Sequence, residues 1–292
     1  MKNVKTGHKQ PIVCLDAGHY GKYNQSPVVK SYYESEMNWK LHLLLKSELE
    51  EYGIQVITTR ANKDKDLGLE ARGKASKDCD LFISLHSNAA DTESIQYVAA
   101  MYQVDDNCGV MDEQSKQFAL LLAESVAAVM KLPYNTWVTK SSSDRDGNGY
   151  KDDYYGVLRG AHTVHTPGVI IEHGFHTNTA TAKWLLVEEN LKKLAEAEAK
   201  TIAEWFDVKK TEKAVTTFTL TLQQLSEGDK GAQVKALQQL LMANGIALHK
   251  YGADSDFGAE TKAGVMEYQR KMNLSADGIA GPNTWKKLLG IK

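Results

Sequence analysis

Short apolar runs alternate with longer amphipathic segments through most of the chain. Runs of aliphatic and β-branched residues, which are typical of buried strands, lie at 12–15, 54–59, 81–85 and 169–171. Segments with apolar residues at helical spacing lie between and after these runs, at 34–52, 67–77, 113–131 and 181–206. Strands that alternate with helices predict an α/β fold, with a mostly parallel twisted sheet flanked by helices.

The pattern changes after residue 208. Residues 209–221 are first charged and then threonine-rich, as expected of an extended linker. Residues 222–292 show a helix, a glycine-containing loop, a second helix, another loop and a short third helix. We therefore predict an α/β domain at 1–208, a linker at 209–221 and a small all-α three-helix domain at 222–292.

The composition is that of a globular protein with enough apolar material for two domains. The 292 residues are 42% hydrophobic and 25% charged, with a formal net charge of -2. A charge this close to neutral indicates neither a nucleic-acid footprint nor a basic membrane-binding surface. No apolar stretch approaches the length of a membrane span. We expect no nucleic-acid partner and no membrane insertion.

The cysteines and the N-terminus indicate the compartment of synthesis. Cys14, Cys79 and Cys108 are odd in number and irregularly spaced, so neither a disulfide framework nor a CxxC metal site is expected. Cys14 and Cys79 lie in or beside strand-like runs, where free thiols are commonly buried. The N-terminus lacks the apolar segment of a signal peptide, which predicts synthesis in the cytoplasm.

Two histidines directly follow strand-like runs. His19 ends the string Asp16-Ala-Gly-His, and His86 lies in Ser84-Leu-His-Ser-Asn. The carboxyl ends of parallel strands form the ligand crevice of an open α/β sheet, so both side chains are expected there. A lone histidine at a strand end is more often a hydrogen-bonded structural residue. The pairing, among small neighbouring residues, favours two metal ligands instead.

A third ligand is expected at the start of the first long helix. Glu34 opens that helix, and with His19 and His86 it would form a His₂Glu zinc site with an open fourth position, one ion per catalytic domain. The alternative is an ordinary acidic residue, which the dipole of a helix N-terminus favours.

An acidic residue also ends the last apolar run. Glu172 follows Ile-Ile in a segment that continues to Asn178, and a carboxylate there is poorly suited to a core. At a metal site it would act as a general base toward the attacking water. The alternative is a carboxylate that only orients a metal ligand.

Together these strings resemble the zinc-dependent N-acetylmuramoyl-L-alanine amidases of the amidase 3 type, found in bacterial autolysins and phage endolysins. The resemblance covers about residues 11–206 and rests on Asp16, Gly18 and His19, then Glu34 and Asn38, then Ser84, His86 and Asn88, and finally Glu172, Gly174, Phe175 and Asn178. It implies zinc held by His19, Glu34 and His86, with Glu172 as catalytic acid and base. It also implies hydrolysis of the amide between N-acetylmuramic acid and L-alanine.

The chain departs from this family pattern beside two of the strings. Tyr20 stands where the family usually has a second glycine, and we expect it to narrow that edge of the cleft. His173 replaces the leucine or glycine that commonly follows the catalytic glutamate. Asn88, His173 and Asn178 are the candidates for substrate contact. For the histidine-rich stretch as a whole, polar loop residues are the favoured interpretation and extra metal or substrate ligands the alternative, at His162, His165, His173 and His176.

A polar loop resembles part of a calcium-binding loop. The candidate calcium ligands are Asp144, Asp146, Asn148 and Asp152, but Tyr155 stands where the bidentate glutamate belongs. A polar turn built on Asn148-Gly149 is the interpretation that we favour over Ca²⁺ binding.

The C-terminal segment resembles the three-helix peptidoglycan-binding domain over about residues 222–290. The matching residues include Leu237-Gln238, Phe257-Gly258, Tyr268-Gln269, Asp277-Gly-Ile279 and Thr284-Trp285. We expect the loops at 254–258 and 277–281 to contact the cell wall. The alternative is a structural appendage without a ligand.

The sequence thus predicts a lytic hydrolase whose partner is bacterial cell-wall peptidoglycan. The competing hypotheses are a zinc peptidase that cuts the stem peptide and a non-catalytic wall-binding protein. With no export signal recognised, a phage endolysin made in the host cytoplasm, which acts at the wall after release, is favoured over a secreted autolysin.

Overall fold

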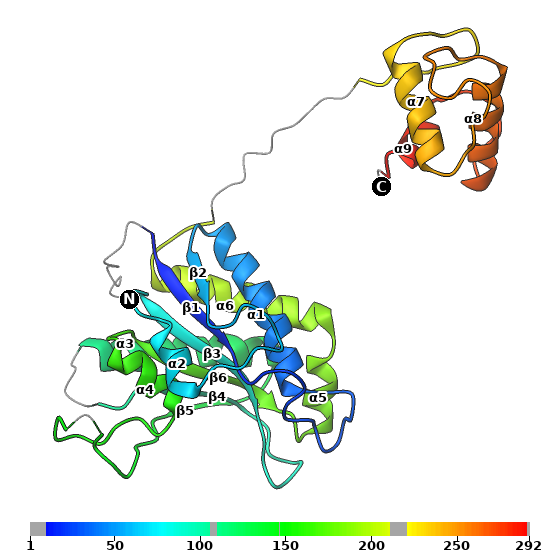
Figure 1. Cartoon of the computed structure of the whole chain (residues 1–292). Coiled ribbons are helices and arrows are strands. Elements are labelled where there is room, and N and C mark those ends of the chain that lie inside the picture. Colours follow the sequence, from blue (N-terminus) through cyan, green and yellow to red (C-terminus); the bar gives the residue numbers. More distant parts are fainter. Residues whose placement is uncertain (1–9, 106–109, 146, 211–220, 291–292) are drawn as a thin grey trace. The chain divides into compact units, whose positions relative to one another are not determined.

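The strands of the N-terminal part form one sheet in the order β2-β1-β3-β6-β4-β5. Neighbouring strands pair in parallel except β4 with β6, which pair antiparallel. Their bounds are β1 Ile12–Ala17, β2 Gln55–Thr58, β3 Leu81–Asn88, β4 Val98–Tyr102, β5 Tyr134–Trp137 and β6 Gly168–Phe175. This computed structural model describes residues 10–105, 110–145, 147–210 and 221–290 (Figure 1).

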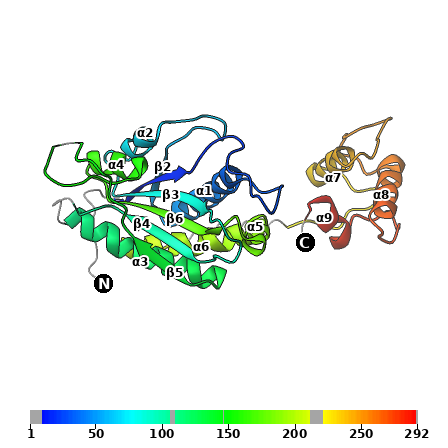
Figure 2. The same cartoon turned by 90° about the horizontal axis from the view of Figure 1, so that it is seen from below.

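Helices cover both faces of the sheet, as Figures 1 and 2 show. One face packs on α1, α3, α5 and α6, and on the other face α2 packs against α4, which contacts the sheet. The bounds are α1 Glu34–Glu51, α2 Leu69–Lys74, α3 Val110–Met130, α4 Gly156–Thr163, α5 Thr179–Leu185 and α6 Glu188–Trp205. The predicted α/β architecture with a mostly parallel sheet is confirmed.

Alternation along the central strands assigns side chains to the two faces. Val169 and Ile171 of β6 belong to the core against α1, α3 and α6, whereas Ile170 belongs to the core against α4. In β3, Ile83 and Phe82 divide in the same way. Since successive side chains of a strand point to opposite faces, this alternation also determines where the polar residues at the strand ends lie.

Two glycines let α2 and α4 touch backbone to backbone. A Cβ atom at Gly73 would lie 2.1 Å from the carbonyl oxygen of Val157, and one at Gly160 would lie 2.2 Å from that of Glu70. Larger side chains would push the helices apart. The glycines of α4 therefore allow the two helices to pack closely. They also interrupt the apolar periodicity by which this helix could have been predicted.

One expectation about the elements needs correction. The predicted helix at 181–206 is two helices, because Val187 takes an extended conformation and ends the first of them. At the break, the carbonyl oxygen of Trp184 accepts from the backbone N–H of Val187 at 3.2 Å and from the side-chain amide of Asn190 at 3.0 Å. The sequence patterns also failed to predict β4, β5 and α4.

The C-terminal helical unit consists of α7 Ala232–Ala243, α8 Ala259–Lys271 and α9 Pro282–Leu288 around its own apolar core. The chain divides by its contacts into two compact units, 1–213 and 214–292. The predicted linker at 209–221 lies mostly outside the described residues, at 211–220.

Two equivalent loops shape the helical unit. The side-chain amide of Gln238 donates to Asp254 at 2.8 Å and to Thr261 at 2.9 Å. Gln269 repeats this arrangement with Asp277 at 2.8 Å and Thr284 at 3.1 Å. These are the two loops that the sequence singled out, and each is tied to the helix that precedes it.

Cys14 and Cys79 are buried free thiols, as expected, and Cys108 lies outside the described residues. Within the described ranges, none of the helices has both the length and the apolar character needed to cross a membrane.

Candidate active site

The candidate site lies where the chain reverses direction across the sheet. From β1 the chain passes to β2 on one side, and it then returns to β3 on the other side of β1. His19 follows β1 and His86 lies near the end of β3, so both border the crevice that such a switch point creates.

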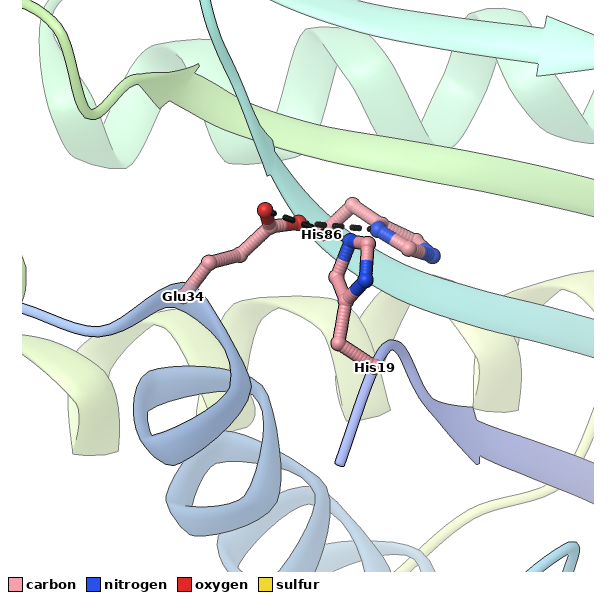
Figure 3. Close-up of side chains that lie close together, drawn as sticks. All are labelled: His19, Glu34 and His86. Carbon is pink, nitrogen blue, oxygen red and sulfur yellow. Dashed lines mark hydrogen bonds and ion pairs between the residues drawn. The ribbon is translucent and has the colours of Figure 1, made fainter. Parts of the chain in front are cut away.

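Three predicted ligands converge at this crevice. Glu34 Oε2 lies 3.3 Å from His19 Nε2, and Glu34 Oε1 lies 2.8 Å from His86 Nδ1 (Figure 3). One ligand atom from each residue lies within 4.8 Å of those of the other two. Two imidazole nitrogens and a carboxylate oxygen are a donor set that suits Zn²⁺, so the residues fit the metal that the sequence predicts.

The backbone at the end of β1 brings the two histidines together. His19 has a left-handed conformation, with φ of 60°, which turns its side chain back over the crevice. Gly18 leaves room for the other ring, because a Cβ atom there would lie 2.3 Å from His86 Cε1. The glycine before His19 is therefore a steric requirement of the site.

Asp16 and Ser84 form a hydrogen-bonded network with the ring of His86. Ser84 Oγ donates to Asp16 Oδ2 at 2.8 Å and lies 3.1 Å from His86 Nε2. Thr59 donates to the other Asp16 oxygen at 2.6 Å, and Arg72 lies 3.7 Å from that oxygen. The first residues of the two sequence strings thus orient the second histidine rather than act as metal ligands themselves.

Glu34 is buried and ionised. Burial alone would raise the pKa of its carboxyl, but the bonds with His19 and His86 outweigh this effect and hold that pKa well below its ordinary value. The backbone N–H of Ser87 adds a hydrogen bond of 3.1 Å. Asn24, which the sequence did not single out, donates to Glu34 Oε2 at 2.7 Å and lies 3.1 Å from His19 Nε2.

Glu172 lies beside the ligands but has a different environment. It is the register partner of His86 across β3 and β6, so both side chains project from the same face of the sheet. Within the described part of the chain, no hydrogen-bond partner contacts Glu172 Oε2. Burial, and secondarily the charge of Glu34, raises the pKa of Glu172 well above its ordinary value.

A cavity of about 320 Å³ joins these groups. His19, Glu34, His86 and Glu172 line it, together with Asn88 and His176. Apolar side chains form the remaining walls, among them Leu69, Met101, Tyr155, Val157 and Ile170. A concave, mostly apolar pocket with a few converging polar groups is typical of a binding site.

His173 does not contact this cavity, which corrects the expectation that it touches substrate. It follows Glu172 on β6 and so points to the opposite face of the sheet, where it is fully buried. Its Nδ1 lies 2.8 Å from the carbonyl oxygen of His86, and its Nε2 lies 2.9 Å from the buried carboxylate of Glu198 on α6.

The bond with His86 lies at an irregularity of the sheet. The register between β3 and β6 shifts after His86, where His173 and Gly174 oppose Ser87 alone. Gly174 has a positive φ of 70°, as a bulge of this kind requires. His173 therefore contacts the backbone of His86, a proposed metal ligand, on the face of the sheet opposite the cavity.

The two asparagines differ in position. Asn88 lines the cavity. Asn178 caps α5 instead, since its side-chain oxygen accepts from the N–H of Thr181 at 3.0 Å and its amide donates to the carbonyl of Glu93 at 2.8 Å. Both ends of its amide serve the fold, which argues against the predicted contact with substrate.

Of the other histidines, His176 lies at the site. It lines the cavity, and its Nδ1 lies 2.9 Å from the carbonyl oxygen of Ser87 and 4.0 Å from Glu34 Oε2. Burial lowers its pKa. His162 and His165 do not line the cavity; His162 Nδ1 lies 3.4 Å from Asp153 and His165 is exposed.

The candidate calcium loop forms polar turns. The carboxylate of Asp144 accepts from the N–H groups of Gly147 at 2.7 Å and Gly149 at 2.8 Å, and Asp152 accepts from that of Arg145 at 2.7 Å. Asn148 accepts from the N–H of Tyr150 at 2.8 Å. Asp146 lies outside the described residues, so a calcium site that includes it stays a prediction.

Family models match both units. The model of N-acetylmuramoyl-L-alanine amidase matches residues 13–204, and a model described as "Putative peptidoglycan binding domain" matches residues 230–288. Both agree with the resemblances seen in the sequence.

Individual proteins match over different lengths. N-acetylmuramoyl-L-alanine amidase CwlL of Bacillus licheniformis is 48% identical over 67 residues, which are 23% of this chain and only 19% of that protein. Uncharacterized protein YqiI of Bacillus subtilis is 27% identical over 197 residues, or 67% of this chain and 84% of that protein. The catalytic domain of CwlV, an amidase of Bacillus (Paenibacillus) polymyxa var. colistinus, has the same fold, with a TM-score of 0.55, 23% identity and coverage of 68% of this chain and 100% of that one.

We predict that Gly18→Ala lowers the affinity for Zn²⁺ by about 10- to 100-fold, because the new methyl group would displace the ring of His86. Competition with a chromogenic chelator measures this affinity. Gly68→Ala is the matched control, since a Cβ atom there meets nothing within 4 Å. Equal affinities for the two variants would contradict the steric role of Gly18.

We also predict that His173 and Glu198 stabilise the fold as a pair. His173→Leu leaves a buried carboxylate without its bonded partner and should lower the free energy of unfolding by about 3–5 kcal/mol. The double variant His173→Leu/Glu198→Leu should lose less than the sum of the two single variants. Urea unfolding of all four proteins measures the coupling, and strictly additive losses would contradict the pairing.

Proposed function

This chain belongs to the N-acetylmuramoyl-L-alanine amidase family, and we propose that it hydrolyses the amide between N-acetylmuramic acid and L-alanine in bacterial peptidoglycan, in a zinc-dependent reaction. One observation carries the proposal: His19, Glu34 and His86 converge beside Glu172, a buried carboxylate that lines the same cavity. Ligands for a hydrolytic metal and a group for proton transfer thus lie together.

Zn²⁺ held by His19, Glu34 and His86 would supply a Lewis acid that polarises the amide carbonyl and makes water more acidic. Glu34 is suited to this role because its carboxyl stays ionised. Asp16, Ser84 and Asn24 hold the side chains of the ligands in place through their hydrogen bonds.

Glu172 is suited to proton transfer. As the water oxygen attacks the carbonyl carbon, Glu172 accepts a proton from the water and then gives it to the amide nitrogen as the C–N bond breaks. The products are a carboxylate on the lactyl group and a free amine on L-alanine. Its raised pKa matches the second half of this cycle, since a carboxyl group that holds its proton more tightly can act as an acid near neutrality.

The helical unit is proposed to hold the enzyme on its polymer. A family model for peptidoglycan binding matches it, and a cavity of about 300 Å³ borders one of its two equivalent loops, with Gln269, Asp277 and Thr284 in its wall. Tethering raises the local concentration of scissile bonds without any new contact at the catalytic site.

We also propose that the protein lyses bacterial cells as a phage endolysin. It would be made in the host cytoplasm and act at the wall after release. Loss of turbidity of a cell suspension tests lysis. Protein with Glu172→Gln serves as the control, because it keeps the wall-binding unit unchanged.

Digestion of purified peptidoglycan followed by mass spectrometry tests the reaction. We expect intact glycan strands and stem peptides with a new free amine on L-alanine, and Glu172→Gln should lower the rate by about 10²- to 10⁴-fold. Cleavage within the stem peptide would instead indicate a zinc peptidase, and a lack of any product would indicate a non-catalytic wall-binding protein.

Removal of the metal tests zinc dependence separately. Dialysis against a strong chelator should abolish amine release, and one equivalent of Zn²⁺ per chain should restore it, because the donor set forms a single site. Circular dichroism of the chelated protein checks that the fold persists. Amide hydrolysis that continues after verified removal of zinc would refute this part of the proposal.

A further inference from the structure

We propose that Tyr20 and Tyr23 form a stacking surface for the N-acetylmuramic acid ring of the substrate, in a second cavity that borders His19 and His86 and does not include Glu172. This inference rests on the proposed function and assigns the two arms of the substrate to two adjoining cavities. The tyrosine pair would then recognise the sugar, and the cavity at Glu172 would receive the peptide.

A second cavity borders the same two histidines. Its volume is about 450 Å³, and it shares four wall residues with the catalytic cavity, namely His19, Leu69, His86 and Val157. Tyr20, Tyr23 and Arg72 line this second cavity, whereas Glu172 lines only the first. The two histidines therefore border two adjoining recesses, of which one contains Glu172 and the other contains the tyrosines.

The chemistry of the reaction orients the substrate between these recesses. Glu172 must reach the amide nitrogen to protonate it, so the leaving amine and its peptide lie on the side of Glu172. The acyl half of the bond points the other way. Because the lactyl group joins this acyl carbon to the sugar, N-acetylmuramic acid extends toward the cavity that contains the tyrosines.

The two tyrosines are partly exposed aromatic side chains in the wall of this cavity. Tyr20 is 40% exposed and Tyr23 is 52% exposed. Their rings stack with centroids 6.3 Å apart, and Tyr23 stacks on His19 with centroids 5.2 Å apart and an interplanar angle of 13°. The C–H groups of a pyranose carry partial positive charge and pack favourably on the negative face of an aromatic ring.

Hydrogen bonds fix the loop that carries these rings. The N–H of Tyr23 donates to Ser35 Oγ at 2.8 Å, and that hydroxyl donates to the carbonyl oxygen of Gly21 at 2.9 Å. Gly21 N–H in turn donates to the carbonyl oxygen of Lys63 at 2.9 Å. A surface held in advance loses little conformational entropy when it binds a ligand.

Polar groups complete the recess. Asp66 is exposed, and its Oδ1 lies 3.1 Å from Nη2 of the buried Arg72. An aromatic wall with a few hydrogen-bonding groups is the composition expected of a site for a sugar that carries hydroxyl and N-acetyl substituents.

Two soluble substrates with the same scissile amide test the proposal. One is an N-acetylmuramoyl-L-alanyl peptide, and the other is the D-lactyl-L-alanyl peptide, which keeps the bond but lacks the sugar. The readout is the ratio of kcat/KM for the two substrates, measured with the zinc-loaded full-length protein. A ratio cancels any effect that a variant has on the metal site itself.

We expect the wild-type protein to prefer the muramoyl substrate. Tyr20→Ala and Tyr23→Ala should each lower the ratio by roughly three- to tenfold, as expected for the loss of one stacking contact. Tyr23→Phe should keep the ratio, because it retains the ring. Tyr134→Ala is the matched control, since Tyr134 is 44% exposed and lines neither cavity.

An unchanged ratio in both alanine variants would overturn the proposal. If kcat/KM for each substrate is also unchanged, the tyrosines have no part in substrate binding. If kcat/KM falls equally for both substrates, the tyrosines act only through His19.

Failure of the proposed function would appear differently, as a wild-type protein that cleaves neither substrate. In that case, N-acetylmuramic acid itself is titrated while the ring resonances of Tyr20 and Tyr23 are followed by NMR. Shifts that saturate in the wild-type protein and vanish with Tyr23→Ala support the stacking surface, and a lack of shifts refutes it.

Discussion

The bonds between the Glu34 carboxylate and the two histidines hold the candidate site together. Glu34 is 2% exposed, and removing such a charge from water costs several kcal/mol unless hydrogen bonds replace the lost hydration. His19, His86, Asn24 and the backbone of Ser87 supply those bonds. These partners lie in the loop after β1 and in β3, whereas Glu34 lies at the start of α1, so one buried charge ties together segments that are distant in the sequence.

The same fold gives two neighbouring glutamates opposite properties. Glu34 is surrounded by imidazoles, which hold its pKa well below the ordinary value. Glu172 lies beside apolar walls and near the charge of Glu34, and burial raises its pKa. Two carboxyl groups whose pKa values are driven apart can divide the work of binding a cation and moving a proton. The parallel register between β3 and β6 brings these environments into one cavity.

The fold class and the proximity of the proposed ligands followed from local patterns. His19 and His86 could be placed because parallel strands end at a common edge, and Glu34 because a helix begins there. The strand β4 could not be predicted, since Val98–Tyr102 contains two alanines and depends on antiparallel pairing with β6. Asn24 was equally hidden, because its contact with Glu34 depends on the path of a loop.

The alternation of side chains along β6 could have predicted the position of His173. Its place next to Glu172 in the sequence suggested the cavity instead. Val169, Ile171 and His173 alternate along one strand with Ile170 and Glu172, so His173 had to face the core of α6. Buried there, it needs a polar partner, and Glu198 supplies one from α6. The two departures from the family pattern thus have different roles. His173 holds the backbone of His86 on the face of the sheet opposite the cavity, because it lies on a strand. Tyr20 lies on a loop outside the sheet and lines the second cavity, where it can contact a substrate.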